Sequence, residues 1–369
     1  MSKTQTVHLL YRSSSRKDDT QINDALAHFE AQLTTSFHLH CIVDGWFGKY
    51  RAAKKIKSLI KSSSGPVIIV TRVVDHTETA ISIRDKFRFQ PVKVLFELHE
   101  TAIPHMVYLE KNKKIKAFLS YKKEKKLFRA VDGILCTAHP QLALLDEKFP
   151  YHAPATVLPN SYDEVLFQLP SKKSLRRKQD TFHMRYAGAF SEWKNTGVMI
   201  EALKLLPENV VLDIAGGKLG ANDTTEKMLT RQSHAHNVNK RVNYFGLLPP
   251  KQVPLFLAEA DCLLLPLGNN VQSCFFTSPI KLFEYAASNV PMIVARQPTT
   301  LSLIKDGVHA LMAEPDSPQD LARAVQYLMQ NHDLGKKLAK NAKKWVTQYS
   351  TNARAANYEK FLDKLINKI

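Results

Sequence analysis

The 369-residue sequence has little cysteine and no long apolar run. Its four cysteines lie far apart, and none forms a C-x-x-C pair or stands at zinc-finger spacing from histidine. They indicate free, buried thiols rather than a disulfide framework or a structural zinc site. No stretch approaches the ~20 consecutive apolar residues that span a bilayer. The first residues turn polar after two leucines, too soon for a signal peptide. We therefore expect a cytoplasmic protein, peripheral on the inner face of the membrane.

Acidic residues are also scarce. The 52 Lys and Arg residues outnumber the 34 Asp and Glu residues, which gives a formal net charge of +18. Such an excess attracts nucleic acid, anionic lipid or phosphorylated substrates, and composition alone leaves all three open. Because the sequence contains no zinc finger and no aromatic-rich RNA-binding motif, we expect no nucleic-acid partner. A basic nucleic-acid-binding protein is nevertheless the alternative from another functional class.

Short apolar runs alternate with amphipathic segments along the whole chain, which predicts an α/β protein with parallel sheets covered by helices. In the first half, we expect strands at Thr6–Tyr11, His38–Val43, Pro66–Val70, Val92–Leu98 and Val131–Cys136, and helices at Asp19–Leu33 and Tyr50–Lys61. In the second half, we expect strands at Phe182–Gly188, Val210–Ala215, Val242–Phe245, Cys262–Pro266 and Met292–Ala295, and helices at Gly197–Leu206, Lys251–Glu259, Ile280–Ser288 and Pro318–Gln330.

The polar, basic segment Ser171–Asp180 lacks periodicity and is expected to link two halves. We predict a first domain of residues 1–165 and a second of residues 166–349, with the helical segment 350–369 crossing back onto the first. A chain of this length suits two domains. Because open parallel sheets bind ligands beyond the carboxyl ends of their strands, we expect the site in a cleft between the domains.

One stretch of the second half, FFTSPIKLFEYAA, carries the richest chemistry. Thr277 or Ser278 can cap a helix there, and Pro279 suits its first position. The start of such a helix presents backbone N–H groups to phosphate. Lys281 and Glu284 fall on one polar stripe, where the lysine can balance diphosphate charge and the glutamate can accept hydrogen bonds from a ribose diol. The alternative is an ordinary Lys–Glu pair on a helix surface.

This stretch resembles the SP-x-K-x-x-E-Y signature of retaining glycosyltransferases of family four, which have the GT-B fold. Further segments resemble motifs of that family in the same order along the chain: VLPNSYD at 157–163, RYAGAFSEWKNTG at 185–197, DIAGG at 213–217, YFG at 244–246 with the segment 253–266, and DGVHALMA at 306–313. The resemblance covers residues 157–345. It implies two Rossmann-like domains whose parallel sheets face each other across a cleft.

The resemblance also implies a donor site for a nucleotide diphosphate sugar. Glu284 would bind the ribose, Lys194 would reach the diphosphate, and Gly246 would lie near the base. The donor-binding residues expected are Gly188, Lys194, Gly216, Gly217, Gly246, Thr277, Ser278, Pro279, Lys281, Leu282 and Glu284. For the glycines, the alternative is a tight strand-to-helix turn. The sequence departs from the family at Phe276, where many members have glutamate, and at Ala189, where arginine is frequent.

In the first half, the segment FELHETAIP ends a predicted strand with His99 and Glu100. It resembles the H-D or H-E that follows a strand in these enzymes. This implies that His99 contacts the donor sugar near its anomeric carbon and that Glu100 acts as general base on the acceptor hydroxyl. The alternatives are a core hydrogen bond for His99 and a helix N-cap for Glu100. Since helix N-termini and lysines can replace a divalent ion at the leaving diphosphate, we expect no metal and no other cofactor.

Two lysine-rich stretches, 50–61 and 111–129, carry apolar edges, formed in the second by Ile115, Phe118 and Leu119. They predict contact with an anionic membrane surface, and a solvated helix face is the alternative. Together these features predict a retaining, hexosyltransferase-like enzyme that moves sugar from a nucleotide diphosphate sugar to a lipid-linked glycan acceptor, in surface polysaccharide or glycoconjugate synthesis. A 2-epimerase of the same fold and a catalytically silent sugar-nucleotide-binding protein are the alternatives.

Overall fold

The computed structural model describes residues 7–13, 37–43, 48–99, 101, 111–168, 181–191, 194–217 and 224–367, with the backbone alone for 7–13, 37–43, 48–49 and 111–116. The chain divides into two compact units, the first ending at Leu95 and the second running from Phe96 to Lys368. The domain boundary expected between residues 165 and 166 stays a prediction. The expected linker Ser171–Asp180 and the expected helix Asp19–Leu33 lie outside the described residues.

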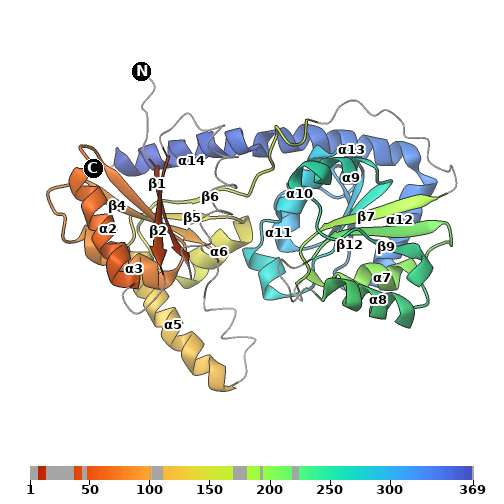
Figure 1. The fold of residues 1–369 in the computed structure, drawn as a ribbon, viewed down its shortest axis with the longest axis horizontal. Coiled ribbons are helices and arrows are strands. Elements are labelled where there is room, and N and C mark those ends of the chain that lie inside the picture. The colour runs from red at the N-terminus through yellow and green to blue at the C-terminus, as the bar shows by residue number, and fades with distance from the viewer. Residues whose placement is uncertain are drawn as a thin grey trace. The chain divides into compact units, whose positions relative to one another are not determined.

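The first unit contains a parallel pair of strands and two helices followed by strands of a second sheet (Figure 1). Its elements are β1 (Val7–Ser13), β2 (Phe37–Val43), α2 (Gly48–Ser62), β3 (Val67–Thr71), α3 (Val74–Arg84) and the start of β4 (Val92–Leu98). In the parallel pair, Val7 lies opposite Phe37. Ile60, Ile83 and Val92 form a small buried cluster in this unit. The four strands expected up to Leu98 and the helix expected at 50–61 are therefore confirmed to within two residues at either end.

The second unit begins with the end of β4 and continues through α5 (Lys111–Ala130), β5 (Gly133–Cys136), α6 (His139–Lys148) and β6 (Ala155–Val157). The strand order of this sheet is β3-β4-β5-β6, and β5 pairs parallel to β6. Gln141, which is fully buried, donates from Nε2 to the Leu98 carbonyl at 2.8 Å and accepts from the Thr137 N–H at 2.7 Å. This side chain joins the carboxyl ends of β4 and β5.

A six-stranded parallel sheet with the order β12-β11-β10-β7-β8-β9 forms the rest of the second unit. Its strands are β7 (Phe182–Gly188), β8 (Val210–Gly216), β9 (Val242–Tyr244), β10 (Cys262–Leu265), β11 (Met292–Ala295) and β12 (Leu311–Ala313). The five strands expected in this half are confirmed to within one residue at either end. Strands β8 and β9 are added on one side of β7, and strands β10 to β12 on the other. The order therefore reverses between β7 and β10, and open parallel sheets bind ligands at such a switch point.

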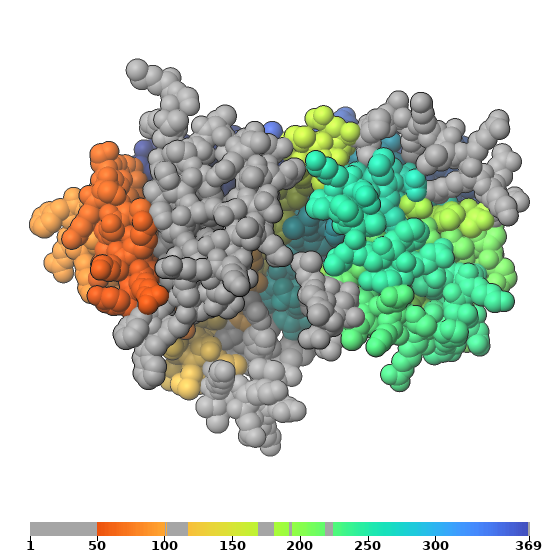
Figure 2. Space-filling model, in the orientation of Figure 1, coloured from red at the N-terminus to blue at the C-terminus, as the bar shows by residue number. Residues whose placement is uncertain are grey.

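Helices connect these strands and follow the last of them along the chain. They are α7 (Gly197–Leu203), α8 (Thr225–Ala235), η3 (Asn239–Arg241), η4 (Pro250–Gln252), α9 (Val253–Ala258), the short π-helix η5 (Gln272–Phe276), α10 (Ile280–Ala287), α11 (Pro298–Leu301), α12 (Pro318–Gln330), α13 (His332–Val346), η6 (Thr347–Tyr349) and α14 (Thr351–Ile366). Figure 2 shows the green-to-teal residues that follow β8 along the chain on the surface facing the viewer. Helix α12 has the start that its sequence predicts, since Ser317 Oγ accepts from the Asp320 N–H at 3.2 Å.

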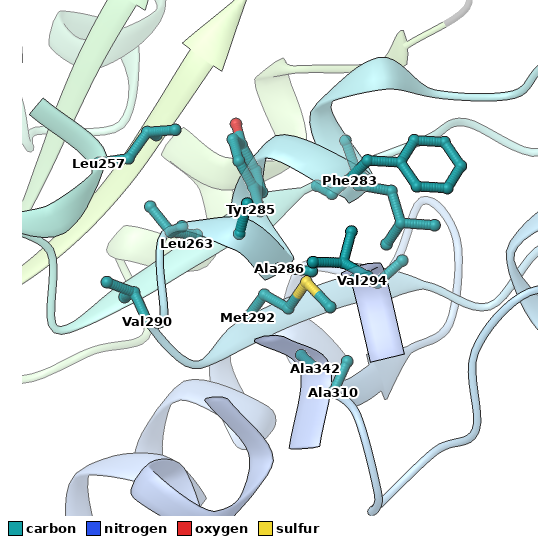
Figure 3. Close-up of a cluster of buried hydrophobic side chains, with 14 of the residues drawn as sticks. Leu257, Leu263, Phe283, Tyr285, Ala286, Val290, Met292, Val294, Ala310 and Ala342 are labelled. Atoms are coloured by element: carbon teal, nitrogen blue, oxygen red, sulfur yellow. The ribbon is translucent and has the colours of Figure 1, made fainter. Parts of the chain in front are cut away.

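Both faces of the six-stranded sheet are buried, as a doubly wound sheet requires. On β8, Leu212 and Ile214 belong to one buried cluster, whereas Ala215 belongs to the other. Figure 3 shows the second cluster, in which Phe283 and Tyr285 of α10 pack over strands β10 and β11. The alternation along β8 follows from the two-residue period of a strand.

A polar ladder crosses three strands within this otherwise apolar sheet. Arg185, Asp213 and Asn243 are register partners on β7, β8 and β9. The Asp213 carboxylate is 1% exposed and accepts from Arg185 Nε at 3.0 Å and from Asn243 Nδ2 at 2.8 Å. His183 Nδ1 lies 2.9 Å from the same carboxylate. Arg185 also donates to the Phe256 carbonyl of α9 at 2.5 Å. The ladder thus satisfies two buried charges and fixes strand register.

Three residues beyond this ladder, each strand or the turn that follows it reaches a glycine. Gly188 is the register partner of Gly216, and the Gly216 N–H donates to the Gly246 carbonyl at 2.8 Å. Gly216 has φ of +128°, which L side chains rarely adopt. A Cβ atom on Gly216 would lie 1.9 Å from the Gly188 carbonyl oxygen. Only glycine therefore fits at this point of closest strand approach.

We predict that Gly216→Ala lowers the free energy of unfolding by more than about 2 kcal/mol, because the added methyl overlaps the Gly188 carbonyl and the backbone is left strained. Urea denaturation followed by circular dichroism measures this change. The matched control is Gly65→Ala, since a Cβ atom there meets nothing within 4 Å. Equal unfolding midpoints for the two variants would show that the strands can separate at Gly216 without cost.

Candidate donor site

The carboxyl edge of the six-stranded sheet brings together several of the glycines expected to bind a donor. Gly188 ends β7, Gly216 ends β8, and Gly246 follows β9. Gly216, Gly217 and Gly246 all have positive φ, at +128°, +141° and +65°. The Tyr244 hydroxyl donates to the Gly216 carbonyl at 2.7 Å, which holds the turn. The space around the glycines differs: a Cβ atom on Gly246 would meet nothing within 4 Å, whereas one on Gly188 would lie 2.7 Å from the Tyr186 hydroxyl. Ligand atoms can therefore approach the backbone most freely at Gly246.

Lys194 lies in the loop that follows β7. Its Nζ donates to the Ala189 carbonyl at 3.0 Å. The pKa of Lys194 is lowered, first by burial and then by the nearby positive charge of Lys281. Lys194 follows β7 and Lys281 lies in the first turn of α10, which follows β10, so the two lysines come from either side of the switch point and their charges repel one another. An anion bound between them would remove this repulsion.

Helix α10 presents the expected polar stripe. Lys281 Nζ lies 2.6 Å from Glu284 Oε2, and the two side chains are 29% and 17% exposed. Lys281 and Glu284 therefore form the Lys–Glu pair at i, i+3 that was the alternative interpretation. The pair is part-buried, and both groups keep unused hydrogen-bonding capacity for a ligand, since an ammonium has three donors and a carboxylate about four acceptor sites.

The start of α10 differs from the expected one. Pro279 occupies the N-cap position rather than the first helical position, and no side chain caps the helix. Ser278 Oγ instead accepts from the Asn160 N–H at 2.9 Å, while Asn160 Nδ2 donates to the Ser278 carbonyl at 2.7 Å. The expectation that Thr277 or Ser278 caps the helix was therefore wrong. The Ser278 hydroxyl accepts a hydrogen bond from Asn160, 118 positions earlier in the chain, instead of from the helix N-terminus.

Leu282 is better described as a core residue than as a donor-binding residue. Its side chain is fully buried in the apolar cluster of Figure 3, and its N–H donates to the Pro279 carbonyl at 2.9 Å. Inclusion of Leu282 in the donor-binding set is thus not supported. The same turn leaves Lys281 and Glu284 on the opposite, part-exposed side of the helix.

The two departures from the family pattern have different structural settings. Phe276 is buried at the end of η5, next to the ring of Phe275, where it packs and offers no polar group. Ala189 is exposed, and its carbonyl accepts from both the Tyr186 hydroxyl and Lys194 Nζ, each at 3.0 Å. The backbone of Ala189 therefore orients Lys194, although its side chain contributes no charge.

His99 follows the last residue of β4, as expected, and its side chain is 45% exposed. Its Nε2 lies 3.4 Å from Oε1 of Glu97, a buried carboxylate that the sequence analysis missed. Arg354 of α14 lies 3.9 Å from the same carboxylate oxygen and donates from Nε to the Pro159 carbonyl at 2.9 Å. The signal for Glu97 was its position two residues before His99, on the same strand face. Glu100 lies outside the described residues.

Two searches of the described residues bear on metals and membranes. No three His, Cys, Asp or Glu side chains in the described part of the chain are grouped to hold a metal ion. Among the described helices, none is long and apolar enough to cross a membrane.

Comparison with known proteins places this geometry in a family context. Residues 168–345 match the model of the family "Glycosyl transferases group 1". The glycosyltransferase MJ1178 of Methanocaldococcus jannaschii is 23% identical over 201 residues, which cover 54% of this chain and 53% of that protein. The chain thus spans about half the length of this curated relative.

Two solved structures resemble almost the whole chain. Sucrose-phosphate synthase from Thermosynechococcus elongatus has a TM-score of 0.73 at 14% identity, covering 99% of this chain and 100% of that one. Anabaena HepE, solved in complex with UDP and glucose, has a TM-score of 0.73 at 16% identity, covering 97% and 99%. The chain therefore has the GT-B fold, and its residues 168–345 match the glycosyl transferases group 1 family.

Proposed function

We propose that the chain is a retaining glycosyltransferase that takes a sugar from a nucleotide diphosphate sugar. One observation carries the proposal: the pKa of Lys194, in the loop after β7, is lowered by burial and in addition by the positive charge of Lys281 on α10. Two lysine charges that act on one another at this edge suit the binding of a diphosphate. The glycine turns and Glu284 beside them supply the contacts that a nucleoside needs.

The charge arrangement also favours departure of the diphosphate. In the proposed reaction, the bond from the anomeric carbon to the diphosphate oxygen breaks, and the electron pair leaves with the nucleoside diphosphate. A bond forms between that carbon and the acceptor hydroxyl oxygen, whose proton passes to a base, for which the chain offers Glu100. The two lysines stabilise the charge that develops on the leaving group, so the proposal requires no metal ion. His99 would contact the sugar near the reacting carbon.

HepE was solved with UDP-glucose, which makes UDP the first ligand to test here. We expect one of UDP, GDP, CMP and ADP to raise the melting temperature, because a ligand at 100 times its Kd adds about 2.7 kcal/mol to the stability. Glu284→Ala should weaken the binding of that ligand about tenfold, or 1.4 kcal/mol, because the hydrogen bonds to the ribose diol are lost. It should leave the 2′,3′-dideoxy analogue unaffected.

Glu226→Ala is the matched control, since Glu226 is an exposed acidic residue in the first turn of α8. A complete absence of stabilisation by any nucleotide would refute the proposed function. Nucleotide binding without sugar transfer to any acceptor would instead identify a catalytically silent protein. Ala189→Arg and Phe276→Glu, which introduce the residues frequent in the family, would then be the first variants to test for recovery of transfer.

Retention is tested separately from binding. We expect the sugar to keep in the product the anomeric configuration that it has in the donor. Proton NMR of the first product formed, before it can mutarotate, measures the coupling between the protons on the first and second sugar carbons. A product of opposite configuration would contradict retention while leaving the donor class intact.

The acceptor proposed is a lipid-linked glycan at the inner face of a membrane, in surface polysaccharide or glycoconjugate synthesis. The support comes from α5, on which Phe118 and Leu119 are exposed among lysines. Lys122 Nζ lies 4.8 Å from the centre of the Phe118 ring. An exposed apolar edge bordered by lysines suits the interface between acyl chains and anionic headgroups. Helix α2 adds exposed lysines in the first unit.

We predict that the protein sediments with vesicles containing anionic lipid and not with neutral vesicles. Replacing Lys122, Lys123 and Lys126 with glutamine should weaken this binding by about 3 kcal/mol, on the order of a hundredfold. The charge-matched control replaces Lys337, Lys340 and Lys344 of α13, which are exposed without an apolar edge. Equal losses in the two triple variants would show that net charge rather than α5 directs binding.

A further inference from the structure

One carboxylate links three loops at the carboxyl edge of the six-stranded sheet. Asp316 lies between β12 and α12, just before the capping residue Ser317. Its Oδ1 accepts from Asn195 Nδ2 at 2.5 Å, in the loop that follows β7. Its Oδ2 accepts from the Asn269 N–H at 2.8 Å, in the loop that follows β10. The bonds therefore span both sides of the switch point.

Two of these residues hold an unfavourable backbone conformation. Asn195 has φ of +45° and Asp316 has φ of +57°. Glycine would adopt either conformation without the steric cost that a side chain brings. Both residues instead carry the side chains that bond to each other, so the local strain is balanced by the contact between the loops. Because surrounding contacts must hold such a conformation, the positive φ values indicate that the bond between the two loops is part of the folded design.

Each of the two loops joined by Asp316 is close along the chain to one lysine of the candidate site. Asn195 is adjacent to Lys194 along the chain. Asn269 precedes η5, which leads into the turn before α10 and thus to Lys281. The Gly268 carbonyl beside Asn269 also accepts from the buried Gln297 Nε2 at 2.9 Å, which anchors this loop to the start of α11. Asp316 is consequently tied to a well-supported loop on one side and to the lysine-bearing loop on the other.

We propose that Asp316 is a positioning residue that holds the Lys194 loop against the loop before α10, so that both lysines can bind one diphosphate. This inference rests on the proposed function and deepens it. The Asp316 carboxylate bonds to Asn195 and Asn269, and it acts on the lysines through these two residues. Its influence should therefore fall on the second phosphate of the donor rather than on the nucleoside.

The test compares Asp316→Gly with the wild type by isothermal titration of UDP and UMP, or of GDP and GMP if GDP gives the larger thermal shift. Glycine removes both hydrogen bonds but tolerates the positive φ, so the variant should fold. We expect diphosphate affinity to fall about tenfold and monophosphate affinity to change less than about twofold. The melting temperature should stay within about 2 °C, because the relief of strain offsets the lost bonds.

Two further variants sharpen the result. Asn195→Gly removes the same loop contact from the other side and should reproduce the selective loss of diphosphate affinity. Asp316→Asn keeps one acceptor oxygen and a residue type that tolerates positive φ, and should restore part of the affinity. Asn237→Gly is the matched control, because Asn237 has φ of +58° just beyond the end of α8, where its N–H donates to the His234 carbonyl.

The outcomes separate this inference from the proposed function. Equal losses of diphosphate and monophosphate affinity in Asp316→Gly, or no loss of either, would overturn the positioning role. If Lys194→Ala weakens diphosphate binding while Asp316→Gly does not, the donor site stands and only this inference fails. If the wild type binds no nucleotide, the inference falls together with the proposed function.

Discussion

The buried carboxylate of Asp213 makes the interactions on which the arrangement of the six-stranded sheet depends. It bonds to Arg185 on one neighbouring strand and to Asn243 on the other, and so sets the register of three strands at one level. A one-residue slip would turn every side chain to the opposite face of the sheet. It would also leave a buried charge unpaired, which costs about 3–5 kcal/mol. The glycine turns meet at the sheet edge because the ladder holds this register three residues earlier.

The same ladder extends support to the candidate site by way of α9. The Arg185 guanidinium lies 4.6 Å from the centre of the Phe256 ring, and that ring packs at 5.3 Å against Phe245, beside Gly246. Charge, ring and turn thus form one continuous set of contacts from the sheet interior to its edge. The turn at Gly246 is consequently supported from the interior of the sheet.

The sequence predicted the strands of the six-stranded sheet well, because each is a short apolar run bounded by polar turns. It failed where a structure depends on partners distant along the chain. Ser278 looked like a helix cap because local pattern favours serine there, yet Asn160 occupies it. Glu97 was missed because its one local signal, the spacing of two residues from His99, does not show that the carboxylate is buried and lies near Arg354 of α14. Helix α8 was missed because only Thr225, Leu229 and Ser233 of it are buried, which leaves a weak apolar stripe.

The bond between Asn160 and Ser278 has a consequence for how the chain can be divided. Tyr162 and Phe167 belong to the buried cluster beneath α10, and the Glu164 carboxylate accepts from the N–H groups of Thr351 and Asn352 at the start of α14. The stretch from Asn160 to Phe167 therefore completes the core around the six-stranded sheet, although the family match begins only at residue 168. A recombinant fragment cut at that position would expose apolar core and remove the Glu164 acceptor from the start of α14. Exchange of this sheet and its helices between relatives must carry the stretch along.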